Sequence, residues 1–163
     1  MLEIVAERWS LERDLQIIQA EVKLTVDGEA LVEEALCIDV GLPALLYGAF
    51  HDVEPNRWAA ATEWRRMPFF VCGCGDPECR GFSFRVRHLD ELTLELTALE
   101  ERQGDKPREM ERTVLSTREY RREALRLGRM YLDFVDGLDY RPYFADTVPV
   151  VAELVERLER EAG

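Results

Sequence analysis

Apolar and polar residues alternate strictly in the first part of the chain. Between residues 16 and 26 every second side chain is apolar, and this period of two is typical of a half-buried β-strand. Asp27-Gly28 follows at once and suits a tight turn, because both positions of such a turn need positive φ angles. We therefore expect the chain to return as a second strand over residues 31–38. The first nine residues are predicted to form a further strand.

The same alternation returns in the middle of the chain. Residues 69–71 are predicted as a strand, and residues 82–86 and 92–96 as two more, with Leu89-Asp90-Glu91 as the turn between them. These segments predict a meander of three antiparallel strands. Its buried face should carry Phe84, Val86, Leu92, Leu94 and Leu96. Residues 100–112 are densely charged and include Gly104 and Pro107, so they are predicted to form an exposed loop.

Helical signals occur once in the first third of the chain and then at its C-terminal end. Gly41-Leu42-Pro43 opens a short predicted helix that runs to about residue 50. Ser116 and Glu119 have the spacing of a capping box, in which each side chain accepts a hydrogen bond from the backbone amide of the other residue. Apolar residues repeat behind them at helical spacing until Gly137, a natural stop. A last helix is expected from about Asp146 onwards.

This order of elements, with strands first and helices last, favours an α+β fold. We expect an antiparallel sheet built from hairpins, with two C-terminal helices packed on it. The 163 residues suit a single domain spanning residues 1–163, and a chain of this length can form a core without disulfides or metal.

Composition narrows the class of protein. Hydrophobic residues make up 47% of the chain and charged residues 33%, which excludes a disordered or low-complexity chain. No apolar run approaches the roughly 18 residues of a membrane-spanning helix. The first residues are acidic and lack the basic and apolar regions of a signal peptide, so a cytoplasmic location is expected.

The net charge of −12 bears on the choice of partner. Phosphate groups of nucleic acids and anionic membranes repel such a protein, so we expect neither as a partner. A protein partner stays open, and nothing in the sequence indicates an oligomeric state. Arg118, Arg122, Arg126 and Arg129 form a basic stripe along the long predicted helix, and they are expected to pair with acidic residues of the same chain.

Three of the four cysteines lie within the segment Cys72-Gly73-Cys74-Gly75-Asp76-Pro77-Glu78-Cys79. Cys72 and Cys74 point to one side of an extended chain because they are two residues apart. Gly75-Asp76-Pro77 is typical of a turn that folds Cys79 back towards them. We therefore expect the three thiols to converge at the tip of a hairpin.

Convergent thiols can hold a metal ion, and Cys72, Cys74 and Cys79 are the candidate ligands for zinc. Structural zinc takes four ligands in a tetrahedron, so one more is needed. The candidates for the fourth ligand are Cys37, His88 and a carboxylate from Asp76 or Glu78. His88 has the same strand parity as Phe84 and Val86, which favours a structural histidine facing the core instead.

Two other interpretations of the cluster stay open. Cys72 and Cys74 could form a strained, comparatively oxidising disulfide, with Cys79 as a resolving thiol. Alternatively, the glycines and Pro77 shape a tight hairpin, and the cysteines are small packing groups that bind nothing.

The segment from Pro68 to Cys79, followed by a β-rich stretch and then by Ser116, Tyr120 and a long helix, resembles a group of uncharacterised bacterial proteins. Their hallmark is an apolar strand, a C-x-C-G-x-x-x-C motif, a second strand and a later helix. The resemblance covers about residues 68–131. It implies a hairpin with this motif and implies no function.

No nucleophile motif, phosphate-binding loop or zinc-protease motif is present, and His51-Asp52 has no partner motif that would favour catalysis. The leading hypothesis is therefore a non-enzymatic cytosolic binding or interaction domain. The alternative is a thiol- or zinc-dependent activity centred on Cys72, Cys74 and Cys79.

Overall fold

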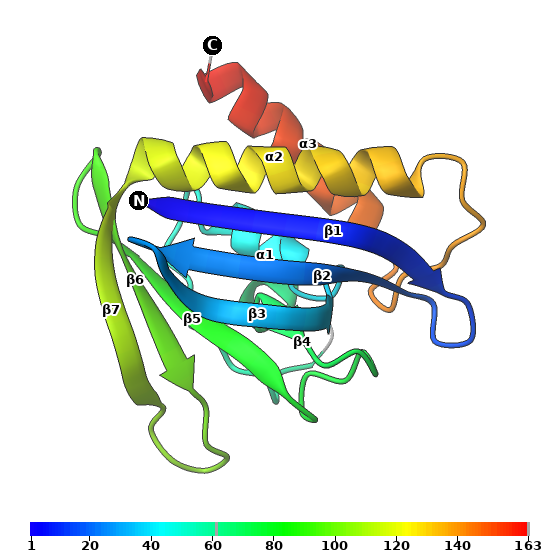
Figure 1. Ribbon diagram of the computed structural model, residues 1–163, viewed down its shortest axis with the longest axis horizontal. Coiled ribbons are helices and arrows are strands. Elements are labelled where there is room, and N and C mark those ends of the chain that lie inside the picture. The colour runs from blue at the N-terminus through cyan, green and yellow to red at the C-terminus, as the bar shows by residue number, and fades with distance from the viewer. Residues whose placement is uncertain (61, 163) are drawn as a thin grey trace.

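The chain folds into one curved antiparallel sheet with helices packed against it (Figure 1). The computed structural model describes residues 1–60 and 62–162, and the side chains of all of these except Ala162. The strands are β1 (Leu2–Glu12), β2 (Ile17–Val26), β3 (Glu29–Cys37), β4 (Phe70–Val71), β5 (Gly81–His88), β6 (Thr93–Glu100) and β7 (Arg108–Ser116). The helices are α1 (Leu42–Tyr47), the short 3₁₀ helix η1 (Trp64–Arg66), α2 (Thr117–Val135) and α3 (Thr147–Ala162).

The seven strands lie side by side in chain order, and every neighbouring pair is antiparallel. The predicted turn at Asp27-Gly28 is confirmed, since both residues have positive φ angles, of 51° and 84°. Strands β1 to β3 form one arm of the sheet, and β5 to β7 form the other. The short strand β4 joins the two arms, pairing with β3 at Cys37 and Val71 and with β5 at Phe70 and Phe82.

Polar contacts join α2 to the sheet edge. Figure 1 shows α2 running alongside β1, and the two elements are in contact. The buried carboxylate of Glu123 accepts a hydrogen bond from the amide of Ile4 at 2.8 Å, and Arg126 donates to the carbonyl of Ile4 and to Glu123. The free edge of β1 is thereby covered. Glu123 and Glu159 are also acidic partners of the arginine stripe, and Arg129 lies 3.1 Å from Glu159 on α3. The α+β class with two C-terminal helices packed on the sheet is confirmed.

One half of the predicted capping box is present at the start of α2. The Ser116 hydroxyl accepts a hydrogen bond from the amide of Glu119 at 3.0 Å, as the sequence predicts. The carboxylate of Glu119 does not return to Ser116, and instead accepts a hydrogen bond from the amide of Leu2 at 2.8 Å. The donor is the backbone amide at the beginning of β1, which is too distant in sequence to be predicted from a local motif.

Substitution Ser116→Ala is expected to lower the free energy of unfolding by about 0.5 to 2 kcal/mol, because an N-terminal amide of α2 loses its partner. Urea denaturation measures this change. Substitution Ser116→Asp, which keeps a capping oxygen, is the matched control and should retain most of the stability. Equal losses in the two variants would contradict a capping role.

The meander of β4, β5 and β6 is confirmed, but one of its predicted core residues is not buried. Phe84, Val86, Leu94 and Leu96 are buried, whereas Leu92 is 77% exposed. Strand β6 begins only at Thr93, and Leu92 belongs to a turn in which its amide donates to the carboxylate of Asp90 at 2.8 Å. The alternation of a strand determines which side a residue faces only within the strand, and Leu92 lies outside it.

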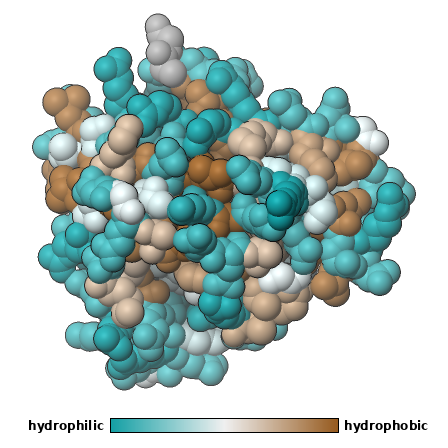
Figure 2. Space-filling view, in the orientation of Figure 1, coloured by the Kyte–Doolittle hydropathy of each residue, from teal (hydrophilic) through white to brown (hydrophobic). Residues whose placement is uncertain are grey.

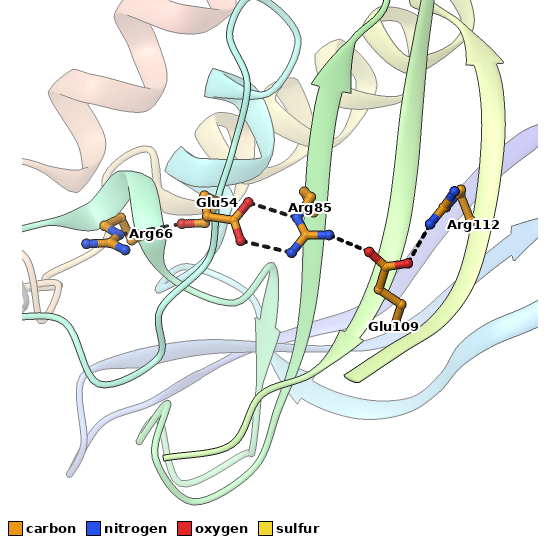
Figure 3. Close-up of polar contacts among 5 residues, drawn as sticks. All are labelled: Glu54, Arg66, Arg85, Glu109 and Arg112. Carbon is orange, nitrogen blue, oxygen red and sulfur yellow. Dashed lines mark hydrogen bonds and ion pairs between the residues drawn. The ribbon is translucent and has the colours of Figure 1, made fainter. Parts of the chain in front are cut away.

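The predicted loop over residues 100–112 is wrong for its second half, because β7 begins at Arg108 and pairs with β6 along its length. Its polar sequence suits an edge strand whose faces are largely solvated. Figure 3 shows how charged side chains join it to the rest of the sheet. Arg85 on β5 lies between Glu54 and Glu109, at 2.8 Å from each, and Arg112 lies 2.6 Å from Glu109.

The face seen in Figure 1 is mainly hydrophilic, with a few hydrophobic side chains between the polar ones (Figure 2). This surface agrees with the alternation on β1 and β2, which sends one set of side chains into the core and the other into solvent. No helix in the described part of the chain is both long enough and apolar enough to cross a membrane.

Candidate metal centre

The thiols of Cys72, Cys74 and Cys79 converge at the tip between β4 and β5. Their three sulfur atoms all lie within 4.8 Å of one another. The tip begins where the amide of Cys72 donates to the carbonyl of Arg80 at 2.7 Å, which closes the hairpin behind the cysteines. The predicted convergence is therefore present, but Cys72 and Cys74 lie in a turn and not on an extended chain as the sequence predicts.

Two consecutive turns bring the thiols together. In the first turn, the amide of Gly75 donates to the carbonyl of Cys72 at 2.8 Å, and Gly75 has a φ angle of 79°, which favours glycine. In the second, the carboxylate of Asp76 accepts a hydrogen bond from the amide of Glu78 at 2.9 Å, and the carbonyl of Asp76 accepts one from the amide of Cys79 at 3.1 Å. This second turn folds Cys79 back, as the Gly-Asp-Pro sequence predicts.

Contacts from three distant segments hold the tip in place. The side-chain amide of Gln19 on β2 donates to the carbonyl of Gly73 at 2.6 Å. Arg57 donates to the carbonyl of Pro77 at 2.7 Å. Arg80 forms a two-pronged ion pair with Glu34 on β3, at 2.6 Å and 2.5 Å. The backbone of the tip is therefore fixed at both of its turns and at its base.

The thiols differ in exposure, and Cys72 and Cys79 differ in acidity. Cys72 is half-buried, whereas Cys74 and Cys79 are exposed. A hydrogen bond from the backbone of Cys74, followed by one from its thiol, lowers the pKa of Cys72, and the charge of Arg80 adds to this effect. Hydrogen bonds with the thiols of Cys74 and Cys72 raise the pKa of Cys79 to about 11. Cys72 therefore ionises more readily than Cys79.

The structure places two of the proposed fourth ligands elsewhere. The first hairpin does dock beside the tip, since Cys37 pairs with Val71, but the thiol of Cys37 is buried and donates to Asp39 at 3.0 Å. His88 lies at the opposite end of β5 from the tip and is half-buried, and its ring Nε2 lies 2.8 Å from the carbonyl of Gly48. His88 is therefore a structural histidine.

The two carboxylates of the tip do not join the thiols either. Among the residues that the structure describes, the cluster of metal-ligating atoms consists of the three sulfurs alone. A zinc ion about 2.3 Å from each sulfur would hold the sulfurs about 3.8 Å apart, so the triad needs to contract by about an ångström at most. The donor set present is three thiols.

The other candidate from the sequence, His51-Asp52, shows no catalytic arrangement. The ring of His51 stacks on Tyr47 with centroids 4.5 Å apart. The carboxylate of Asp52 accepts a hydrogen bond from the amide of His88 at 2.8 Å. Asp52 thereby joins the loop after α1 to β5, whereas His51 packs against α1.

Sequence reasoning missed a buried polar cluster around Asp39. This carboxylate is 2% exposed and accepts hydrogen bonds from the thiol of Cys37 and, at 2.5 Å, from the hydroxyl of Tyr140. The hydroxyl of Tyr131 lies 3.0 Å from that of Tyr140. An acidic residue between Ile38 and Val40 was the available signal. The partner Tyr140 lies 101 residues further along the chain and had none.

Comparison of the chain with models of known families, with characterised proteins and with solved structures gave no match.

Proposed function

We propose that this protein is a non-enzymatic binding domain whose ligand is one thiophilic metal ion, held by Cys72, Cys74 and Cys79. The observation that carries the proposal is the meeting of three sulfur atoms within 4.8 Å on a tip fixed by contacts from β2, β3 and Arg57. Thiolates are the protein ligands that soft metal ions prefer.

The exposure of the thiols supports binding over packing. A cysteine that serves only as a small packing group is among the most buried side chains of a protein, as Cys37 is here. Cys74 and Cys79 are exposed. Two such thiols bury little apolar surface, so packing offers no physical reason for their convergence.

Cd(II) is a suitable probe, because its bonds to thiolates absorb in the near ultraviolet. We expect the purified protein, reduced and free of metal, to bind one equivalent. Serine in place of any one of the three cysteines should weaken binding by more than the roughly 10- to 100-fold that follows loss of an outer-shell partner. The matched control is Cys37→Ala, which removes a thiol outside the cluster and should leave Cd(II) binding unchanged.

Two results would contradict metal binding. The first is a Cd(II)–thiolate absorption band that loses intensity in Cys37→Ala and keeps its intensity in Cys74→Ser. The second is a disulfide between two of the three cysteines that forms in air in the presence of the ion, which would favour a thiol redox function instead. Circular dichroism in a chelator should show an intact fold, since the core does not depend on the tip.

The remaining expectations belong to this proposal. A cytoplasmic, reducing environment keeps three exposed thiols free for metal. The net charge of −12 disfavours nucleic acids and anionic membranes as partners and leaves a protein partner open. The resemblance to uncharacterised bacterial proteins supports a bacterial origin.

A further inference from the structure

This inference rests on the proposed metal site. The identity of the ion follows from the number of metal-ligating atoms that the tip provides. Three of the four other donors that the sequence offers are engaged elsewhere, and the fourth, Glu78, lies outside the cluster of sulfur atoms. Cys37 donates to Asp39, His88 contacts the carbonyl of Gly48, and the side chain of Asp76 accepts the amide of Glu78. In the part of the chain that the structure describes, the cluster contains sulfur and no oxygen or nitrogen donor.

Either of the two distant candidates, Cys37 and His88, could join the thiols only if the tip moved. Gln19 and Arg57 bind the carbonyls of Gly73 and Pro77, and the Arg80–Glu34 ion pair fixes the base of the loop. Substantial movement of the loop towards Cys37 or His88 would break these contacts.

Common thiophilic ions differ in what they require. Structural zinc is almost always four-coordinate and tetrahedral, and iron–sulfur clusters are typically held by four cysteines. Cu(I) is selected by soft thiolates and forms stable trigonal complexes with them. We propose that the Cys72, Cys74 and Cys79 triad is a three-coordinate site for Cu(I).

Binding involves no change of oxidation state. As each copper–sulfur bond forms, an S–H bond breaks and its proton passes to solvent, unless the sulfur is already a thiolate. The exposure of Cys74 and Cys79 leaves the ion accessible to the thiolates of another protein, which suits ligand exchange.

The test is an anaerobic titration of the whole chain with Cu(I), kept reduced by ascorbate and buffered by a chromophoric Cu(I) chelator. We expect one equivalent of copper, surrounded by three sulfur atoms in X-ray absorption spectra. Zn(II) and Co(II) should be lost on gel filtration. Cys79→Ser should lower the affinity for Cu(I) by more than about 100-fold. Glu78→Gln, which alters a carboxylate next to Cys79, should leave it unchanged.

Two outcomes would overturn the Cu(I) assignment while leaving metal binding intact. One is retention of Co(II) with the intense visible spectrum of a tetrahedral thiolate site. The other is Zn(II) binding that weakens in Glu78→Gln, which would identify a carboxylate as the fourth ligand. If the wild-type chain retains neither Cd(II) nor Cu(I), the proposed metal-binding function itself fails.

Discussion

Substitution Gly41→Ala is expected to destabilise the protein by about 3 kcal/mol or more, at the upper end of what overpacking of a core costs. A Cβ atom at this position would lie 2.0 Å from the carbonyl oxygen of Pro68 and 2.2 Å from that of Phe69. Both contacts are to backbone, so no side-chain rotation relieves them. Moving this backbone would displace the side chains of Phe69 and Phe70, which are buried in the core. Urea denaturation measures the loss.

Gly73→Ala is the matched control for this prediction. Neither glycine has a positive φ angle, so alanine suits the backbone of both. The Cβ atom at position 73 would lie 3.2 Å from the side-chain nitrogen of Gln19, which is the end of a flexible side chain and can move. We expect a loss of less than about 1 kcal/mol for this variant. Similar losses of unfolding free energy in the two variants would contradict a steric role for the close contact between Gly41 and the backbone of residues 68–69.

The contact at Gly41 also explains how the tip that carries the three cysteines is positioned. Strand β4 has only two residues, and it pairs with β3 at a single position, Cys37 and Val71. The close packing of Gly41 against residues 68–69 therefore helps to hold β4 beside the first hairpin. Gln19 and Glu34 of that hairpin are then within reach of the tip.

Most of the fold could be predicted because its signals are local. The alternation over residues 16–26 and the turn at Asp27-Gly28 specify a hairpin without help from the rest of the chain. The convergence of the triad also depends on local signals, because two consecutive turns within residues 72–79 bring the three thiols together. These features depend on neighbours within about ten residues.

The features that sequence analysis missed depend on distant partners. Strand β7 has the composition of a loop. It forms a strand because β6 pairs with it, and its Glu109 pairs with Arg85 on β5. Glu119 was assigned to a local capping box, yet its carboxylate binds the amide of Leu2, 117 residues away. His88, a candidate fourth ligand for zinc, is likewise engaged by the carbonyl of Gly48, 40 residues away.

The second large effect is expected at Asp39. Substitution Asp39→Ala should cost about 3 kcal/mol or more, because hydrogen bonds to a charged group contribute about 1.5 to 3 kcal/mol each and the donors on Cys37 and Tyr140 would lose their acceptor inside the protein. Tyr140 lies in the connection between α2 and α3, so the loss should be accompanied by faster hydrogen exchange in that connection. A stable variant with unchanged exchange would contradict this role.

The contribution of Asp39 to the free energy of unfolding should also depend on pH. Burial, its largest cause, raises the pKa of Asp39 above the ordinary value of 3.8. The folded state therefore binds this proton more tightly than the unfolded state does. The sign follows from linkage: the carboxyl group stabilises the fold most at low pH, and this stability decreases as the pH rises from about 3.8 to the raised pKa of the folded state, above which it is constant.

Asp39→Asn isolates this dependence, because asparagine does not ionise. The difference in unfolding free energy, wild type minus Asp39→Asn, should fall as the pH rises through that window, since the other acidic residues contribute equally to both proteins. Tyr140→Phe provides a sharper test. The hydroxyl of Tyr140 stabilises the ionised carboxylate and lowers its pKa, so without it the pKa of Asp39 should rise further. The window should then extend to higher pH in Tyr140→Phe, and an unchanged window would show that Tyr140 does not act on the charge of Asp39.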